Sequence, residues 1–494
     1  MKRCVRAMKR WAAAAVAAAL LCAPAAAQRR DKVLETALLA HVSELASDAY
    51  DGREPGTDGE AKTLRYIGRQ WFDIGLESGT NDPRNAWFAP VKLVAREPAS
   101  SRAVFSRRGR PQFSPPGSTE VFTSGKRTLL NSAPILFVGR GEGEVGRAEL
   151  AGRVALLLDG GTDNAKRQNA LLKAGAAAVM TVLDGERTLD QVRARRSRSG
   201  YALATEELGG DLDAYITSEG MERALAGGPL DLAALKAMAA RPDFGTKLLD
   251  LSVMLEATTR ETRINTHNVI GRLPGRRPDS GAVLLLAHWD HFGECAAPPA
   301  EDLICNGAID NATGVAALTE IARRLAKGPA LDRDVYFLAT TAEEIGLLGA
   351  EAFAEDPPLP LDQIVAAFNL DSIALAPAGT PIGIVGRGMT PLDAGIAAVA
   401  KAQKRKIVEG DATNAYIRRQ DGWALLQHDV PAVMVSSSWS DVARVERFFD
   451  GDYHRPGDQV KAGLDLSGTA EDVAFHVALV RYFADLKKVP PPSK

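Results

Sequence analysis

The feature that most constrains the fold is an alternation of apolar segments and amphipathic helices over residues 264–490. Continuous apolar segments such as AVLLLAH (282–288), VYFLATTAE (335–343) and IVAAFNLDS (364–372) are predicted to be strands. An amphipathic segment such as GVAALTEIARRLAK (314–327) follows a strand and is predicted to be a helix. This alternation favours an α/β fold, with a mostly parallel sheet covered by helices on both faces.

Polar side chains gather where these strands end, which is where open α/β sheets bind their ligands. Two histidines and three or four carboxylates are therefore expected to converge on one edge of the sheet. The residues at these ends, and in the loops beside them, are His288, Trp289, Asp290, His291, Asp310, Glu343, Glu344, Asp371, Tyr453, His454 and Asp458.

Glu343 and Glu344 are adjacent carboxylates at the end of an apolar run, so their mutual repulsion requires a compensating charge. A metal ion is the compensation we expect. Histidine and carboxylate ligands without cysteine suit Zn²⁺ better than Mn²⁺ or Co²⁺. Five ligands exceed the needs of one catalytic zinc, so two ions bridged by a carboxylate and a water are expected, which would lower the pKa of that water and stabilise an oxyanion.

The two adjacent glutamates are expected to have different roles, because successive side chains of a strand point in opposite directions. One would bind metal, and the other would accept a proton from water and return it to the leaving group. Asp290, two residues after His288, is expected to accept the ring N–H of that histidine. His41, His267, His428 and His476 are expected to be structural or surface residues, and the role of His291 is left open.

The rest of the chain divides into simpler parts. Residues 31–79 predict two amphipathic helices joined by a Gly/Pro turn, and the Arg-, Ser- and Pro-rich residues 95–118 predict a connection. Residues 119–255 predict short strands with one or two helices, in a small α/β or β-rich unit. That unit contains neither His nor Cys, so no metal or nucleophile site is expected in it.

The N-terminus is typical of a secretory signal with cleavage after Ala27, because basic residues precede a short apolar run and an Ala-Ala-Ala site. Lipidation at Cys22 is a weaker alternative, since Leu21 is bulky for that processing. No other segment is apolar enough to span a membrane. The formal net charge of −2 gives no electrostatic support for nucleic-acid binding. Cys295 and Cys305 remain after cleavage, and an exported context favours a disulfide over two free thiols.

Together these stretches resemble the secreted co-catalytic zinc aminopeptidases of metallopeptidase family twenty-eight. The matching segments are AHWDHFG, NGAIDNATGVAAL, TTAEEIGLLGAEAF, NLDSI and YHRPGD. The resemblance implies the phosphorylase/hydrolase-like α/β fold, with residues 119–255 similar to an inserted protease-associated domain. The expected division is a signal peptide (1–27), an N-terminal helical part with its connection (28–118), the insertion (119–255) and the catalytic domain (256–494).

The resemblance also implies roles for individual residues. His288 and Asp371 would hold one zinc, Glu344 and His454 a second, and Asp310 would bridge them. Glu343 would be the general base and acid, Asp290 would orient His288, and the Tyr453 hydroxyl would stabilise the substrate carbonyl. The chain departs from the family at RRQDGWALLQHDVP (418–431), where many members have Ser-Asp-His.

The leading hypothesis is therefore a metallo-aminopeptidase that binds two zinc ions and removes N-terminal residues from peptides with a free N-terminus. A carboxypeptidase or dipeptidase would instead need a cation for the substrate carboxylate, and Arg387, Arg418 and Arg419 are the candidates. A glutaminyl cyclase is a further alternative. A non-catalytic binding protein should lack a ligand or the base, and here all are present. The oligomeric state is left open.

Overall fold

The computed structural model describes residues 30–81, 83–84, 86–112, 115–141, 143–160, 164–197, 200–206, 209–277 and 279–491. The expected signal, residues 1–27, lies outside the described residues. Within them, no helix is both long enough and apolar enough to cross a membrane. The chain forms two compact units, a larger one up to Val91 and from Thr266 onward, and a smaller one from Lys92 to Asn265. Residues 119–255 fall wholly within the smaller unit.

The larger unit is built on a mixed sheet whose central strands are parallel. Strand β11 is hydrogen-bonded to β14 on one side and β15 on the other, both parallel, and β15 is parallel to β17. Strands β10 and β16 are antiparallel to their neighbours β14 and β17. The α/β prediction is thus confirmed, with an antiparallel strand on either side of the parallel ones. The bounds are β10 Lys247–Leu273, β11 Ala282–His288, β14 Asp334–Thr340, β15 Ile364–Asn369, β16 Gly383–Val385 and β17 Ala432–Ser436.

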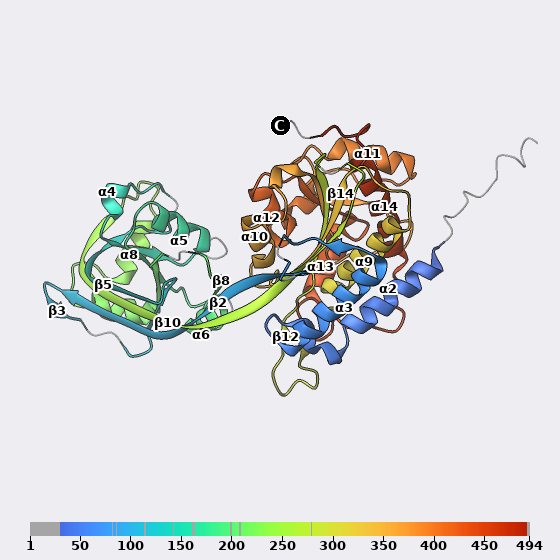
Figure 1. Ribbon diagram of the computed structural model, residues 1–494. Coiled ribbons are helices and arrows are strands. Elements are labelled where there is room, and N and C mark those ends of the chain that lie inside the picture. The colour runs from blue at the N-terminus through green and yellow to red at the C-terminus, as the bar shows by residue number, and fades with distance from the viewer. Residues whose placement is uncertain are drawn as a thin grey trace, which may run out of the picture. The chain divides into compact units, whose positions relative to one another are not determined.

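Helices cover both faces of this sheet (Figure 1). Along β11, Val283 and Leu285 pack into the core beneath α2, α3, α9, α11 and α14, whereas Leu284 and Leu286 pack into the core that holds α10 and α12. Because every residue of β11 is buried, its apolar run is continuous rather than alternating. The bounds are α9 Thr313–Ala326, α10 Leu348–Glu355, α11 Asp393–Ala402, α12 Gly422–Gln427, α13 Val442–Asp450 and α14 Ser467–Phe483.

The N-terminal segment of the larger unit is the expected pair of helices. Helix α2 (Lys32–Leu45) begins at Asp31, whose side chain accepts a hydrogen bond from the backbone of Leu34. Helix α3 (Asp58–Ile74) ends at Gly75, which adopts φ 89°. Between them lies the turn η1 (Asp48–Arg53).

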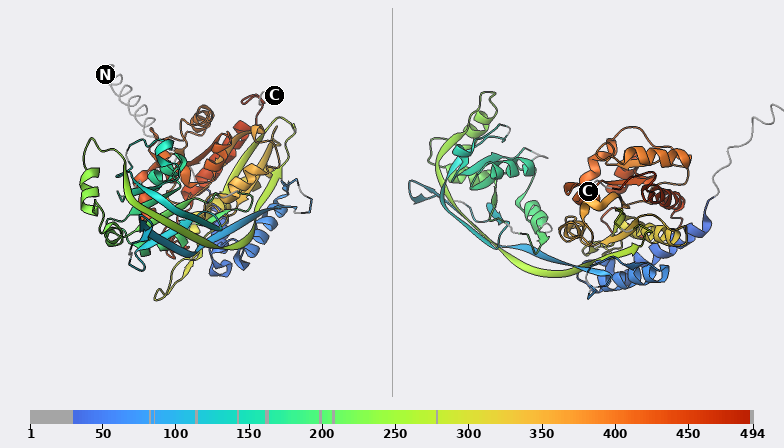
Figure 2. Two further views of the ribbon diagram at one scale, coloured as in Figure 1. Left: turned by 90° about the vertical axis from the view of Figure 1, so that its left-hand side faces the viewer. Right: turned by 45° about the horizontal axis from the view of Figure 1, so that its top comes forward.

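Two long strands run from one unit into the other: β2 (Phe88–Arg107) and β10, which pair with each other (Figure 2). The prediction of a connection at residues 95–118 was therefore wrong as far as Arg107. Several side chains in the middle of β2 are exposed, so the sequence shows no apolar alternation there. Backbone pairing, which requires no apolar side chains, holds this segment extended.

The smaller unit has its own core, and its strands continue the sheet from β10 through β5. Strands β5 (Arg127–Phe137), β6 (Val154–Leu158), β7 (Ala178–Val182) and β9 (Leu212–Ile216) are parallel in that order, and β4 (Thr119–Thr123) pairs antiparallel with β9. The predicted strands in this region are thus confirmed, but the expectation of one or two helices was too low. Besides α5 (Asn164–Lys173) and α7 (Ser218–Leu225), the described residues of this unit form α4 (Arg147–Leu150), α6 (Leu189–Ser197) and α8 (Leu232–Ala239).

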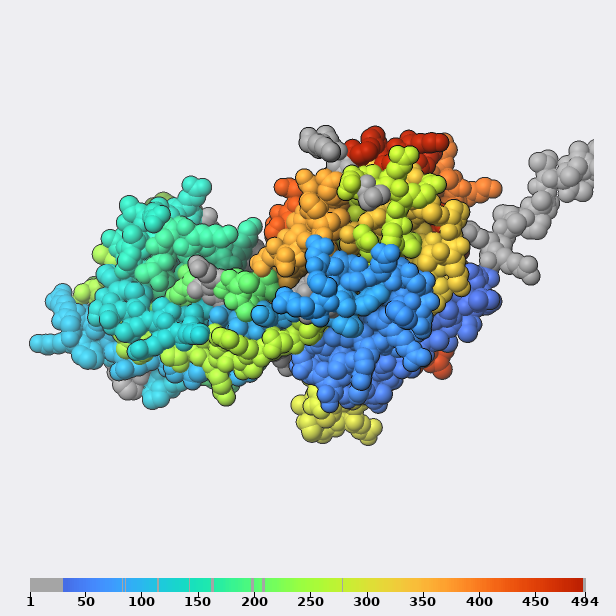
Figure 3. Space-filling model, viewed as in Figure 1, coloured from blue at the N-terminus to red at the C-terminus, as the bar shows by residue number. Residues whose placement is uncertain are grey.

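A disulfide joins Cys295 to Cys305, as expected for an exported protein. It closes a hairpin made of β12 (Gly293–Glu294) and β13 (Ile304–Cys305). This hairpin projects from the larger unit as the yellow protrusion of Figure 3. It lies between His288 and Asp310 in the chain, so it connects two of the predicted site segments.

Candidate metal centre

The predicted site residues lie at the carboxyl ends of neighbouring strands. His288 is the last residue of β11, Glu343 and Glu344 follow β14, and Asp371 follows β15. Because β14 and β15 lie on either side of β11 and run parallel to it, these ends are adjacent. Asp310 lies in the irregular turn η2 (Ala308–Ala312) that leads into α9.

The five predicted ligands come together around Asp310. His288 Nε2 lies 3.2 Å from Asp310 Oδ1 and 3.7 Å from Asp371 Oδ1. His454 Nε2 lies 3.4 Å from Asp310 Oδ2 and 2.9 Å from Glu344 Oε2. The two oxygens of Asp310 thus face different histidines, which is the arrangement that a bridging carboxylate requires.

These side chains fit a divalent cation. Ligand atoms of His288, Asp310 and Glu344 all lie within 4.8 Å of one another. Among the described residues, His288 Nε2, His454 Nε2 and Asp310 Oδ2 are buried without a well-aligned hydrogen-bond partner. Buried polar atoms that lack partners are costly, and a metal ion would satisfy all three. Histidine nitrogens with carboxylate oxygens form a donor set that suits zinc.

The electrostatics of the centre point the same way. Burial would lower the pKa of His454, but the nearby carboxylates of Asp310 and Glu344 outweigh it and raise that pKa to about 9. Burial likewise opposes protonation of His288, yet the charge of Glu343 and the nearby carboxylates of Asp310 and Asp371 raise its pKa well above the usual value. The carboxylates therefore attract protons in place of a cation, and a metal ion would displace them.

Glu343 differs from its neighbour Glu344. Burial raises the pKa of Glu343 well above its usual value. The charge of His288 acts to lower this pKa, and the charge of Glu344 acts to raise it. Within the described part of the chain its carboxylate makes no hydrogen bond or ion pair, whereas that of Glu344 contacts both His291 and His454. An unpartnered carboxyl group with a raised pKa suits proton transfer.

Asp290 has a different partner from the one expected. The ring Nδ1 of His288 lies 3.2 Å from the backbone carbonyl of Asp290 and 3.8 Å from its carboxylate. The carboxylate instead accepts hydrogen bonds from the backbone N–H groups of Glu343, at 3.1 Å, and Glu344, at 3.4 Å. Asp290 thus fixes the tautomer of His288 through its backbone and the glutamate loop through its side chain.

Tyr453 lies against a predicted ligand. Its ring stacks on that of His454 with centroids 3.6 Å apart. Its hydroxyl accepts a hydrogen bond from Nη2 of Arg419 at 3.2 Å. Burial, together with the charges of Asp310 and Glu344, raises the pKa of Tyr453 well above its usual value, so the hydroxyl remains a hydrogen-bond donor at neutral pH.

The structure shows hydrogen bonds of His291 and Asp421 that the sequence did not predict. His291 Nδ1 is hydrogen-bonded to Glu344, and the Phe292 ring lies 4.5 Å from that of His454. Asp421, fully buried, accepts a hydrogen bond from Thr340 at the end of β14. Burial raises the pKa of Asp421 to about 7. The position of His291 three residues after His288 was the only signal for its role.

Two further residues support the backbone around Asp310. The carboxylate of Asp458 accepts hydrogen bonds from the N–H groups of Ile309 at 2.9 Å and Asp310 at 3.0 Å. Arg53, which sequence reasoning missed, is fully buried and donates to four backbone carbonyls. These belong to Leu45, Trp289, Asn306 and Gly307. Nothing in DGREPG beyond the arginine itself signals this role.

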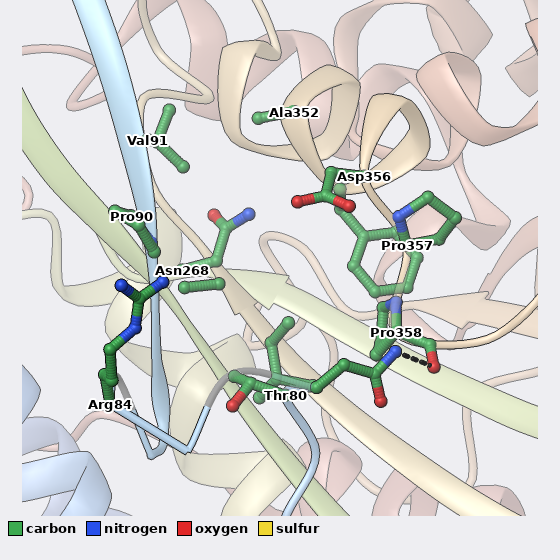
Figure 4. A pocket seen from close by; sticks show the side chains of 13 residues that line it. Thr80, Arg84, Pro90, Val91, Asn268, Ala352, Asp356, Pro357 and Pro358 are labelled. Atoms are coloured by element: carbon green, nitrogen blue, oxygen red, sulfur yellow. Dashed lines mark hydrogen bonds between the residues drawn. The ribbon is translucent and has the colours of Figure 1, made fainter.

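A separate pocket of about 460 Å³ lies in the larger unit (Figure 4). Its thirteen lining residues include none of the predicted ligands, but they include Asn268. The Asn268 side chain accepts from the N–H of Thr341 at 3.0 Å and donates to the carbonyl of Gly349 at 2.8 Å. It therefore fixes both ends of the loop that carries Glu343 and Glu344.

Comparison with known proteins agrees with this geometry. Residues 268–478 match the model for Peptidase family M28, and this region includes all five predicted ligands and Glu343. The chain is 33% identical over 103 residues to the alkaline phosphatase isozyme conversion protein of Escherichia coli strain K12, covering 19% of this chain and 29% of that protein. It is 29% identical over 130 residues to aminopeptidase YwaD of Bacillus subtilis strain 168, covering 26% of each. The matched regions thus span less than a third of these relatives.

Among solved structures, the aminopeptidase from Aneurinibacillus sp. strain AM-1 superposes with a TM-score of 0.53 at 20% identity. The match covers 91% of this chain and 93% of that one. At this identity the likeness concerns the fold, and it extends over both units of the chain.

Proposed function

We propose that the chain, whose residues 268–478 match the model for Peptidase family M28, is a zinc-dependent exopeptidase that removes N-terminal residues from peptides. The observation that carries the proposal is the placement of Asp310 between two histidines, with one carboxylate oxygen facing each. An unpartnered Glu343 stands beside this group. The arrangement supplies both a metal centre and a group for proton transfer.

We propose two zinc ions in this centre. His288 and Asp371 would hold one, Glu344 and His454 the other, and Asp310 would bridge them. When bound, the ions would polarise the substrate carbonyl and lower the pKa of water. Each of the five side chains lies within 3.7 Å of another of the set.

The protein side chains would then complete the reaction. Glu343 would take a proton from the attacking water and return it to the leaving amine. The Tyr453 hydroxyl, protonated at neutral pH, would donate a hydrogen bond to the developing oxyanion. The acidic groups Glu343 and Asp371, beside the proposed metal ions, would bind the free amine of the substrate, which distinguishes an aminopeptidase from a carboxypeptidase.

We further propose that the smaller unit is a protease-associated domain and that the protein is exported. The absence of histidine and cysteine from residues 119–255 agrees with a non-catalytic role. The disulfide Cys295–Cys305 agrees with an oxidising compartment.

The substitution Glu343→Gln tests the assigned base. It removes proton transfer without removing a proposed ligand, so zinc content should remain at about two ions per chain while kcat falls by about a hundredfold or more. Zinc is measured by elemental analysis of the purified protein, and hydrolysis is measured with leucine p-nitroanilide. The matched control is Glu351→Gln in helix α10, whose carboxylate contacts His428 rather than the centre.

Near-normal turnover by Glu343→Gln would remove that residue from the mechanism. Wild-type protein that binds two zinc ions but cleaves only N-blocked peptides, at their free carboxyl end, would replace the aminopeptidase with a carboxypeptidase.

A further inference from the structure

The structure separates the three arginines that the sequence offered as binding groups for a substrate carboxylate. Arg387 Nη1 donates to the backbone carbonyls of Val408 and Gly410, so its guanidinium has a structural role. Arg418 lies over the ring of Trp423, 4.9 Å from its centroid. Arg419 alone of the three contacts a predicted site residue, because its Nη2 donates to the hydroxyl of Tyr453.

Arg419 is exposed and its charge is not neutralised. Its guanidinium lies 4.5 Å from the centroid of the Phe449 ring and 5.5 Å from that of Tyr453. These rings hold the side chain in place without cancelling its charge. No carboxylate within the described ranges forms an ion pair with it. A fixed cation is therefore available beside the proposed centre.

The contacts also order the groups along the site. Asp371 is next to His288, His288 and His454 lie on either side of Asp310, and Tyr453 stacks on His454. Arg419 follows Tyr453 in this series. The carboxylate proposed to bind the substrate amine and the cation thus stand at opposite ends of the series of contacts. A substrate that lies along it would present its leaving portion to Arg419.

We propose that Arg419 binds a carboxylate on the leaving portion of the substrate, so that dipeptides are the preferred substrates. This inference rests on the proposed exopeptidase function. A second residue joined through the scissile bond places its own carboxylate only one residue beyond the reacting carbonyl. A charge-assisted hydrogen bond from an exposed guanidinium should give about a tenfold preference for the carboxylate.

Two sources supply this chemistry: the terminal carboxylate of a dipeptide and an acidic side chain in the second position of a longer peptide. Both place a carboxylate within reach of a guanidinium, which binds it with two parallel hydrogen bonds. Substrates that carry only one of the two distinguish them.

The experiment compares kcat/KM for Leu-Ala and its amide, and for Leu-Glu amide and Leu-Gln amide, using the zinc-loaded full chain. For the wild type we expect about a tenfold preference for Leu-Ala over Leu-Ala amide, expressed mainly in KM. Arg419→Gln should reduce this ratio to near one. Arg418→Gln is the matched control, since it removes the adjacent arginine without touching Tyr453, and it should keep the wild-type ratio. A preference for Leu-Glu amide over Leu-Gln amide would assign the acidic side chain as a source.

Wild-type protein that cleaves leucine p-nitroanilide but does not distinguish either carboxylate from its neutral counterpart overturns this inference alone. A preference that survives Arg419→Gln also overturns it. Cleavage of none of these compounds by zinc-loaded protein overturns the proposed function as well.

Discussion

Two arginines of the larger unit are buried to the same extent and bind the same kind of partner, yet they support different regions. Arg53 is 1% exposed and Arg333 is 0% exposed. Each donates to four backbone carbonyls. For Arg53 these belong to Leu45, Trp289, Asn306 and Gly307; for Arg333 they belong to Ser280, Phe483, Val489 and Pro490.

The difference lies in what the carbonyls are attached to. Trp289 follows the predicted ligand His288, and Gly307 precedes Asp310 by three residues. Arg53 therefore joins the two loops on either side of the disulfide hairpin, whereas Arg333 joins the C-terminal segment to the sheet. The comparison teaches that the same local chemistry stabilises the fold in both places but positions site residues in only one.

The largest expected effect is the one the two arginines share. Arg53→Met and Arg333→Met each leave four backbone carbonyls without their donor, so each should lower the free energy of unfolding by about 3–5 kcal/mol. Urea unfolding of the metal-free variants checks this. A difference above about 2 kcal/mol between them would break the equivalence.

His476 is a third buried basic residue, and it differs from Arg53 and Arg333 because it binds one backbone carbonyl rather than four. His476 Nδ1 donates to the carbonyl of Asp472, and burial lowers its pKa from 6.5 to about 4. Since the unfolded chain binds the proton more tightly, stability is full above pH 6.5 and is lost as the pH falls towards 4, by about 3 kcal/mol.

The variant His476→Leu should lose that part of the acid sensitivity. Urea midpoints at pH 7 and pH 4.5 measure it in both proteins. If the urea midpoint falls equally in the wild type and in His476→Leu, other groups cause the loss of stability in acid. His476 would then be protonated in the folded protein with a single carbonyl as its partner.

The smallest expected effect separates the two arginines. Lysine keeps the charge but offers its donors from one point, so it cannot reach four carbonyls. Arg53→Lys should lower kcat/KM on leucine p-nitroanilide about tenfold, or about 1.4 kcal/mol, and should weaken zinc retention against a chelator. Arg333→Lys should stay within about twofold of the wild type. Equal values for the two variants, measured on folded protein, would reduce Arg53 to a purely structural residue.

Much of the fold was predictable because its signals are local. The strands of the larger unit are continuous apolar runs, and the helices between them repeat at helical spacing. The strand β2 was missed because its middle has exposed Arg, Ser and Pro side chains, and only pairing with β10 keeps it extended. Such pairing is non-local, and side-chain pattern does not record it.

The site was predictable because histidine and carboxylate residues lie at or just after the ends of strands of the larger unit. A carboxylate after a parallel strand does not by itself mark a site, as the smaller unit shows. Asp159 directly follows the parallel strand β6, but an ion pair with Arg187 and a hydrogen bond from Asn164 satisfy it. What sequence missed in the larger unit acts through backbone atoms: Arg53 and the carboxylates of Asp290 and Asp458 bind carbonyl or amide groups whose positions no residue type reveals.

The bonds from Asp458 to the amides of Ile309 and Asp310 set an order of events during synthesis. A ribosome makes the segment around Arg53 long before the loop around Asp458. Until that loop is available, the turn that presents Asp310 lacks the acceptor for two of its amides. The growing chain therefore cannot hold this carboxylate as the folded molecule does, and a metal ion that needs Asp310 would bind only after the loop around Asp458 has been made.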